Sequence, residues 1–210
     1  QYDEQKWEFA HQALLELTKH PEGKQFIADF CTTAVEQPAD IERFSQRHLY
    51  FSLKRDLKPV ANSKTCFKPT REFLAAVAQG APQTIVAEKL AQSEWPATLM
   101  IAIAIIAQRA CGGHTKDTIA DAISVWRPEW IERCYSNAPQ LRGLLQRPIQ
   151  GYLAARDKLV MHNIRLVYKL ARENQTRGIP VRDLVQEGII GLVRAAEKFD
   201  YRMGFRFSTY

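Results

Sequence analysis

Proline and glycine recur along this chain at short intervals, and the segments between them carry apolar residues three and four positions apart. That spacing places the apolar side chains on one face of an α-helix. Proline also favours the first turn of a helix, which Pro21, Pro38, Pro69 and Pro128 fit. Three of the apolar stripes are Trp7, Ala10, Leu14 and Leu17; Phe26, Ile27, Phe30 and Ala34; and Ile119, Ala122, Ile123 and Trp126. We therefore predict an all-α fold, with a loop from Leu57 to Pro69.

The longest apolar run extends from Leu99 to Ala107. It is too short to span a bilayer, and its alanine content predicts a buried helix instead. The chain begins without a secretory signal pattern. No membrane partner is therefore expected.

The residues that usually mark catalytic or metal sites are scattered. The cysteines are Cys31, Cys66, Cys111 and Cys134; none forms a Cys-x-x-Cys pair, and no histidine lies at zinc-ligand spacing. We find no glycine-rich phosphate loop, nucleophile setting or paired carboxylates. The sequence thus predicts reduced, mostly buried thiols and a protein that is not an enzyme, with no catalytic residue, metal or cofactor.

Positive charge is concentrated at the C-terminal end. From Pro139 onward there are 13 Lys and Arg against 6 Asp and Glu, a net charge of +7, whereas the whole chain carries +6. Segregation of this kind is typical of a polyanion-binding module, although a solvated basic surface is the alternative. We predict a helical N-terminal domain of unknown role at 1–138, a connector with Pro139 and Pro148 near its ends, and a second domain within 139–210.

The second domain shows the pattern of two antiparallel helices. One long helix is expected from Ile149 to about Asn174, with Gly178 as its terminator and Pro180 at the start of the next. Gly188 falls within the inward stripe of the second helix, where a missing side chain lets two helices approach closely. That stripe consists of Val181, Leu184, Val185, Leu192, Ala196 and Phe199.

Four residues of the second helix share its outward face. Asp183, Gln186, Glu187 and Ile190 are spaced i, i+3, i+4 and i+7. Two carboxylates and an amide around an aliphatic side chain suit docking of a basic helix. The alternative, a capping Asp183 beside ordinary surface residues, stays open on these grounds.

Aromatic and basic residues alternate after the second helix. Cations neutralise phosphates, and aromatic rings stack on bases that have left the duplex, so this segment suits opened nucleic acid. Phe199 and Phe207 are expected in the core, whereas Phe205 and Tyr210 are the better candidates for base contact. The predicted DNA-contact residues of this part are Arg194, Lys198, Phe199, Asp200, Tyr201, Arg202, Phe205, Arg206, Ser208 and Tyr210.

Three ordered motifs in this domain resemble region 2 of the sigma-70 family, the promoter-recognition subunits of bacterial RNA polymerase. They are Asn-x-Arg-Leu-Val at 163–167, Asp-Leu-x-Gln-Glu-Gly-x-x-Gly-Leu at 183–192 and Gly-Phe-x-Phe-Ser-Thr-Tyr at 204–210. The resemblance covers about Ala154 to Tyr210, roughly a quarter of the chain. The N-terminal domain resembles no family that we recognise.

The resemblance implies specific roles. Asp183, Gln186 and Glu187 match positions that contact the clamp helices of the polymerase beta-prime subunit. Tyr210 matches the tyrosine that stacks on a flipped base of the minus-ten promoter element, and Phe199 and Asp200 lie near that pocket. The positions that hold a second flipped base correspond to Asn163, Leu166 and Ser208. Two residues depart from the family: Ile189 replaces a frequent Asn, and Met203 a frequent Arg.

The expected function is therefore that of a sigma factor fragment, truncated within region 2 and working in the cytoplasm with the nucleoid. Its expected partners are the polymerase core and promoter DNA, chiefly the non-template single strand, and could include an anti-sigma factor. One rival is a regulator that uses the hairpin to occlude other sigma factors without opening promoters. Another is a helical scaffold that binds neither. The N-terminal domain could inhibit the basic tail, add a DNA arm or sense a signal.

Overall fold

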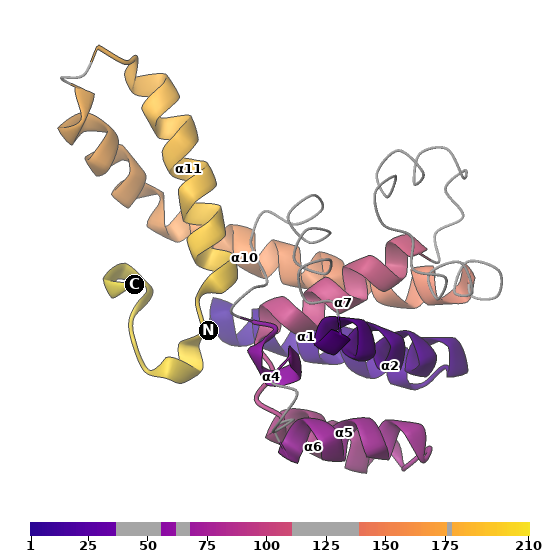
Figure 1. Cartoon of the computed structure of the whole chain (residues 1–210). Helices are drawn as coiled ribbons and strands as arrows, with labels where there is room; N and C mark the ends of the chain where they lie inside the picture. Colours follow the sequence, from indigo (N-terminus) through magenta and orange to yellow (C-terminus); the bar gives the residue numbers. More distant parts are fainter. Residues whose placement is uncertain (37–55, 62–67, 111–138, 176–177) are drawn as a thin grey trace.

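The computed structural model describes residues 1–36, 56–61, 68–110, 139–175 and 178–210, and these are helical with short connections. The described elements include no strand, which confirms the all-α prediction. Figure 1 shows their arrangement. In chain order they are α1 (Tyr2–Thr18), α2 (Pro21–Glu36), α4 (Lys58–Ala61), α5 (Lys68–Ala78), α6 (Gln83–Gln92), α7 (Ala97–Ala110), α10 (Pro139–Glu173), α11 (Val181–Lys198), and the 3-10 turns η3 (Tyr201–Met203) and η4 (Phe207–Thr209).

The N-terminal helices surround one apolar core. Helix α7 contributes Leu99 through Ala104 at no more than 1% exposure, so the predicted buried helix is confirmed. Helices α1 and α2 cover α7, and the α5–α6 pair packs at the other side of α2 (Figure 1). Trp95 is buried between these layers and donates from Nε1 to the hydroxyl of Thr70 at 3.0 Å. No helix in the described parts is long and apolar enough to cross a membrane.

The predicted loop from Leu57 to Pro69 is partly helical. Helix α4 forms one turn at Lys58–Ala61, and α5 begins at Lys68. Burial of Leu57 and Val60 in the core explains this turn, because tertiary packing can stabilise a helix too short to persist alone. Cys31 is buried as expected. Outside the described residues lie the predicted stripe at 119–126, the predicted helix starts at Pro38 and Pro128, and Cys66, Cys111 and Cys134.

Helix α10 begins at Pro139, ten residues before the predicted start at Ile149. The expected connector is therefore helical, with Pro148 inside the helix. Proline removes one backbone hydrogen bond there. Burial of a stripe from this half of α10 against the N-terminal helices offsets that loss; it consists of Leu141, Leu145, Ile149 and Tyr152. The division of the chain at residue 138 stays a prediction.

The second half of α10 and all of α11 form the predicted antiparallel hairpin, which projects from the N-terminal helices (Figure 1). Its own core contains Leu159, Val160, Val167, Leu192, Ala196 and Phe199. A Cβ on Gly188 would lie only 2.6 Å from Cγ1 of Val167, so the close approach predicted at this glycine is confirmed. Gly178, at the hairpin turn, has a φ of +73°, which favours glycine.

Candidate functional site

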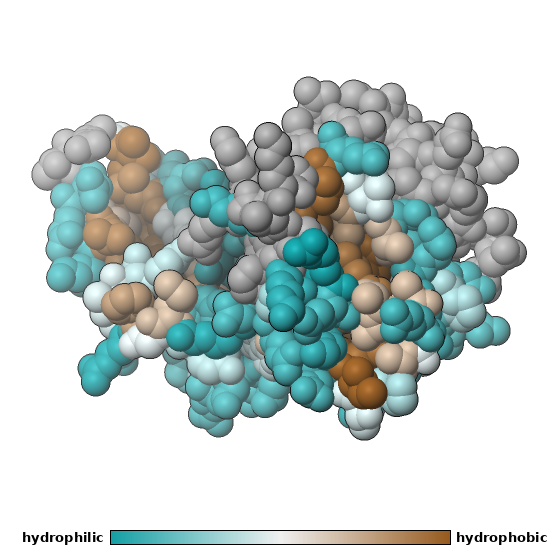
Figure 2. All heavy atoms as spheres, turned by 60° about the horizontal axis from the view of Figure 1, so that its bottom comes forward, coloured by the Kyte–Doolittle hydropathy of each residue, from teal (hydrophilic) through white to brown (hydrophobic). Residues whose placement is uncertain are grey.

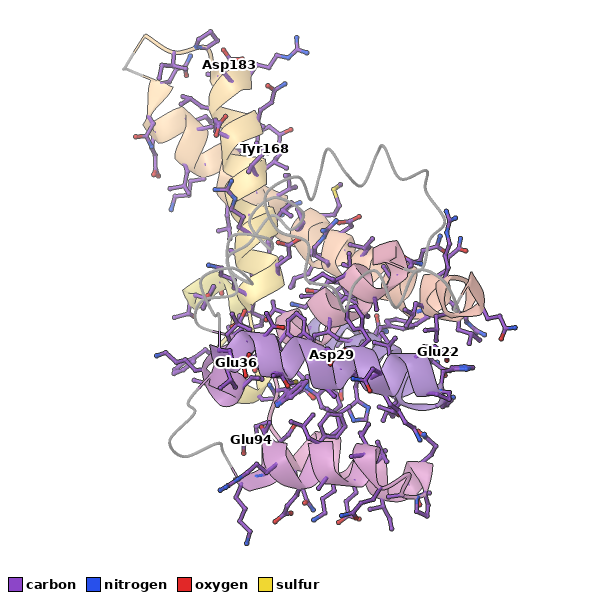
Figure 3. The ribbon with its side chains drawn as sticks, turned by 45° about the vertical axis from the view of Figure 1, so that its right-hand side comes forward. Glu22, Asp29, Glu36, Glu94, Tyr168 and Asp183 are labelled. Carbon is purple, nitrogen blue, oxygen red and sulfur yellow. The ribbon has the colours of Figure 1, made fainter. Side chains whose placement is uncertain are left out.

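The predicted docking face of α11 is exposed. Asp183, Gln186, Glu187 and Ile190 all lie on the solvent side of the helix, with Ile190 40% exposed. Figure 3 shows Asp183 near the end of the hairpin that is remote from the N-terminal helices. The opposite side of α11 buries Leu192 and Ala196. The face therefore presents an aliphatic side chain among two carboxylates and an amide, which complements a partner surface that is basic and partly apolar.

Ile189, one of the two residues that depart from the family pattern, does not belong to this exposed face. It is half-buried and packs against the hairpin core. An aliphatic side chain at this position adds to the apolar contact between the two helices. Its neighbour Ile190 stays exposed, so the departure leaves the docking face in place.

A groove of about 430 Å³ runs along one side of the hairpin. Leu166 and Leu170 of α10 line one wall, Leu184 and Gly191 of α11 line the other, and the tail contributes Phe207, Ser208 and Tyr210. In the view of Figure 2, hydrophobic residues gather on the hairpin at the left. Apolar clefts of this size with a few polar groups are typical of small-ligand sites.

Two of the three residues predicted to hold a second flipped base meet at this groove. Leu166 and Ser208 lie 42 positions apart in sequence and both line it. Asn163 lies one turn before Leu166, is half-buried, and donates from its amide to the carbonyl of Leu159 at 2.8 Å. The same side chain also carries a second N–H donor and an acceptor oxygen.

The tail aromatics divide into buried and exposed rings. Phe199 is 8% exposed, and Phe207 packs against it edge-on with centroids 5.2 Å apart, as predicted for core residues. Phe205 and Tyr210 are 64% and 57% exposed, and Tyr201 is 38% exposed. The rings of Tyr210 and Phe199 pack edge to face, with their centroids 5.7 Å apart. Its exposed surface therefore remains open to a stacking partner.

The tail cations are not equivalent. Arg194 and Arg206 are exposed, and Lys198 is half-buried. Arg202 instead forms an ion pair with Asp200 at 2.7 Å, lies 5.7 Å from the ring centroid of Trp7, and donates to the carbonyl of Trp95 at 3.4 Å. Burial alone would raise the pKa of Asp200, but Arg202 outweighs it and lowers the pKa. Contact between Arg202 and DNA stays a prediction. In the structure, the guanidinium binds residues of the protein itself.

Sequence reasoning missed a set of α1 residues at the end of α11. Lys6 is fully buried; its ammonium donates to the carbonyls of Ala196 and Phe199, the latter at 3.2 Å, and lies 2.5 Å from Oδ1 of Asp3. The other carboxylate oxygen of Asp3 accepts from the amide of Tyr201 at 2.6 Å. These residues are about 190 positions from their partners and belong to no motif, so nothing in the local pattern could have indicated them.

A second buried ion pair joins α10 to the last turn of α11. Arg156 donates to Glu197 at 2.8 Å, and the two side chains are 15% and 3% exposed. Burial raises the pKa of Glu197, against the opposing effect of Arg156. Within the described residues, no group of three or more His, Cys, Asp or Glu side chains could hold a metal ion.

Comparison with known proteins supports the C-terminal resemblance. The family described as Sigma-70 region 2 matches residues 159–210. RNA polymerase sigma factor SigA of Nostoc sp. is 54% identical over 82 residues, which cover 39% of this chain and 20% of that relative. RNA polymerase principal sigma factor HrdC of Streptomyces coelicolor is 44% identical over 72 residues, covering 34% and 21%. The chain thus spans about a fifth of these relatives' length, and no solved structure gave a significant match.

Proposed function

We propose that this chain, whose residues 159–210 are a region 2 of the sigma-70 family, serves as a sigma factor that brings RNA polymerase to promoters. The observation that supports this most is the combination of the match with the hairpin geometry. One side of the hairpin offers an exposed acidic and aliphatic face, and another offers an apolar groove beside exposed aromatics. The matched relatives are named sigma factors, which gives the rival reading as an occluding regulator no support.

Docking on the polymerase would use α11. Asp183, Gln186, Glu187 and Ile190 would contact the clamp helices of the beta-prime subunit. Their exposure and their position on the projecting hairpin support this assignment. The complex would form in the cytoplasm, where an anti-sigma factor could compete for the same face.

Promoter opening would use the groove and the tail. Tyr210 and Phe205 would stack on bases of the non-template strand, and Arg194 and Arg206 would neutralise its phosphates. Leu166 and Ser208 would line the place of a second flipped base, with Asn163 beside them. The protein would perform no chemistry on the DNA and would stabilise the opened strand by binding it.

Charge reversal on the docking face tests the polymerase part of this proposal. We expect Glu187→Arg to weaken binding of the full chain to the isolated clamp helices by at least tenfold, about 1.4 kcal/mol. Glu22→Arg makes the same charge change at a half-buried position in the first turn of α2, far from the hairpin (Figure 3), and should leave binding unchanged. Equal affinities of both variants and the wild type in a calorimetric titration would refute docking through this face.

A further inference from the structure

The C-terminal end of α11 is satisfied by a residue from the other end of the chain. The last carbonyls of a helix have no partner within the helix and carry partial negative charge. Lys6 of α1 donates to one such carbonyl, that of Ala196, and to the carbonyl of the C-cap residue Phe199, and it pairs with Asp3. Two of the three N–H donors of the ammonium thus find carbonyl acceptors, and its charge is balanced by the Asp3 carboxylate at 2.5 Å. This explains how a fully buried lysine can be tolerated at this junction.

Helix α1 also holds the first turn after α11. Asp3 accepts the amide hydrogen of Tyr201 at 2.6 Å, at the residue where η3 begins. On the next residue, the Arg202 guanidinium lies over Trp7 of α1 and reaches the carbonyl of Trp95. Two successive residues of the tail are therefore fixed by N-terminal helices. The exposed ring of Phe205 follows only three residues after Arg202.

We propose that α1 is a positioning element for the DNA-contact segment, acting through Asp3 and Lys6 on the backbone from Phe199 to Arg202. These contacts set the direction in which the chain leaves α11. They thereby set the positions of Phe205 and Arg206, and of Tyr210, which lines the groove. The proposal rests on the proposed function in one respect: it takes this segment to bind DNA.

This role gives the N-terminal helices a function in binding that does not require them to touch DNA. A segment held in its binding geometry loses less conformational freedom when its ligand arrives, and affinity rises accordingly. The docking face lies on the outer side of α11 and is exposed. Loss of the α1 contacts should therefore affect DNA binding much more than polymerase docking.

Four variants of the full chain test this role. Asp3→Ala removes the acceptor for Tyr201, whereas Asp3→Asn keeps an oxygen at that place. Lys6→Met removes the donors to α11, and Asp3→Ala serves in its place if Lys6→Met does not fold. Lys19→Met is the control, because Lys19 is 46% exposed and its ion pair is with Glu16 on the same helix turn.

Two measurements are needed on each variant. Amide hydrogen exchange reports the hold on Tyr201 and Arg202, with amides in the N-terminal half of α11 as internal reference. Fluorescence anisotropy reports affinity for a labelled single-stranded oligodeoxynucleotide that carries a minus-ten element. We expect Asp3→Ala and Lys6→Met to speed exchange at Tyr201 and to weaken DNA binding about tenfold. We expect Asp3→Asn to retain more of the Tyr201 protection and more of the DNA affinity than Asp3→Ala does. Lys19→Met should match the wild type in both measurements.

Several outcomes would overturn the role of α1. Unchanged exchange at Tyr201 in both Asp3→Ala and Lys6→Met would show that α1 does not hold the turn. Faster exchange with unchanged DNA affinity would show that the held turn does not position the contact residues. Equal exchange rates at Tyr201 and equal DNA affinities in Asp3→Ala and Asp3→Asn would show that Asp3 does not act as a hydrogen-bond acceptor for this turn. If the wild type itself bound no DNA, the proposed DNA function would fail, and the exchange data alone would then support or overturn the hold on Tyr201.

Discussion

At the scale of single residues, exposure separates side chains that look alike in the sequence. Phe199 and Phe207 share a short segment with Phe205 and Tyr210. Phe199 is buried in the hairpin core and Phe207 packs half-buried against it, whereas Phe205 and Tyr210 face solvent. Arg202 differs from Arg194 and Arg206 in its contacts, because it pairs with Asp200 and lies over the ring of Trp7. We infer that the packed group contributes to stability, and DNA contact by the exposed group stays a prediction.

Removal of an exposed ring should therefore weaken DNA binding without loss of stability. We expect Tyr210→Ala to lower affinity for a single-stranded minus-ten oligonucleotide by about 1–3 kcal/mol, the usual contribution of one base-stacking ring. Tyr168→Ala is the matched control, since Tyr168 is 49% exposed on α10 and lies outside the tail. An equal loss in both variants, measured by anisotropy, would contradict a specific role for Tyr210.

The Arg202–Asp200 pair makes a prediction about pH. Arg202 depresses the pKa of Asp200 below its ordinary value, so this carboxylate stabilises the fold above that value and the contribution is lost as pH falls through the depressed pKa. We expect Arg202→Gln to raise the pKa of Asp200, because burial then meets less opposition once the guanidinium charge is gone. Carboxyl chemical shifts followed by NMR through acid titration would measure it. An unchanged or lower pKa in the variant would contradict the pairing.

At the scale of elements, helix periodicity predicted the hairpin well but misplaced the start of α10. The apolar face, the turn at Gly178 and the small residue at Gly188 follow from local pattern. The proline at position 148 suggested a boundary, since proline usually ends helices. The helix continues because its earlier turns bury Leu141 and Leu145 against helices that are distant in sequence.

The contact at Gly188 predicts a sharp difference between two glycines of α11. Gly188→Ala would place a methyl group against Val167, and overpacking of this kind typically costs about 1–3 kcal/mol of the free energy of unfolding. A Cβ on Gly191 meets no atom of the described structure within 4 Å, so Gly191→Ala should be neutral or stabilising by up to about 1 kcal/mol. Chemical denaturation measures both. Similar stability changes in the two variants would contradict the close helix approach.

At the scale of the whole molecule, α10 joins two cores. Its first half packs with the N-terminal helices and its second half with α11. The Arg156–Glu197 pair and the Lys6 contacts join the same elements near their crossing. The projecting hairpin is therefore anchored at its base rather than attached through a free linker (Figure 1).

This anchoring predicts that residues 139–210 alone are less stable than the same residues in the full chain. The isolated piece would expose the apolar stripe at Leu141, Leu145, Ile149 and Tyr152, and α11 would lose its contact with Lys6. We expect a lower midpoint in thermal unfolding followed by circular dichroism, or self-association detected by light scattering. A monomeric piece that unfolds at the temperature of the full chain would contradict this coupling and favour an independent C-terminal domain.

The sequence by itself determined the helical class, the hairpin, the exposed face of α11 and the resemblance to region 2. Each of these depends on residues within a few helical turns of one another, so periodicity and motif spacing are enough to predict it. Only the tertiary structure decided that α1 contacts the end of α11, that Arg202 is bound by Trp7 and Asp200, and that Leu166 meets Ser208 at one groove. Most of these contacts join residues far apart in the sequence. The contact of Arg202 with Trp7 and the contacts of Lys6 with the end of α11 depend on how separate helices pack, which no local pattern records.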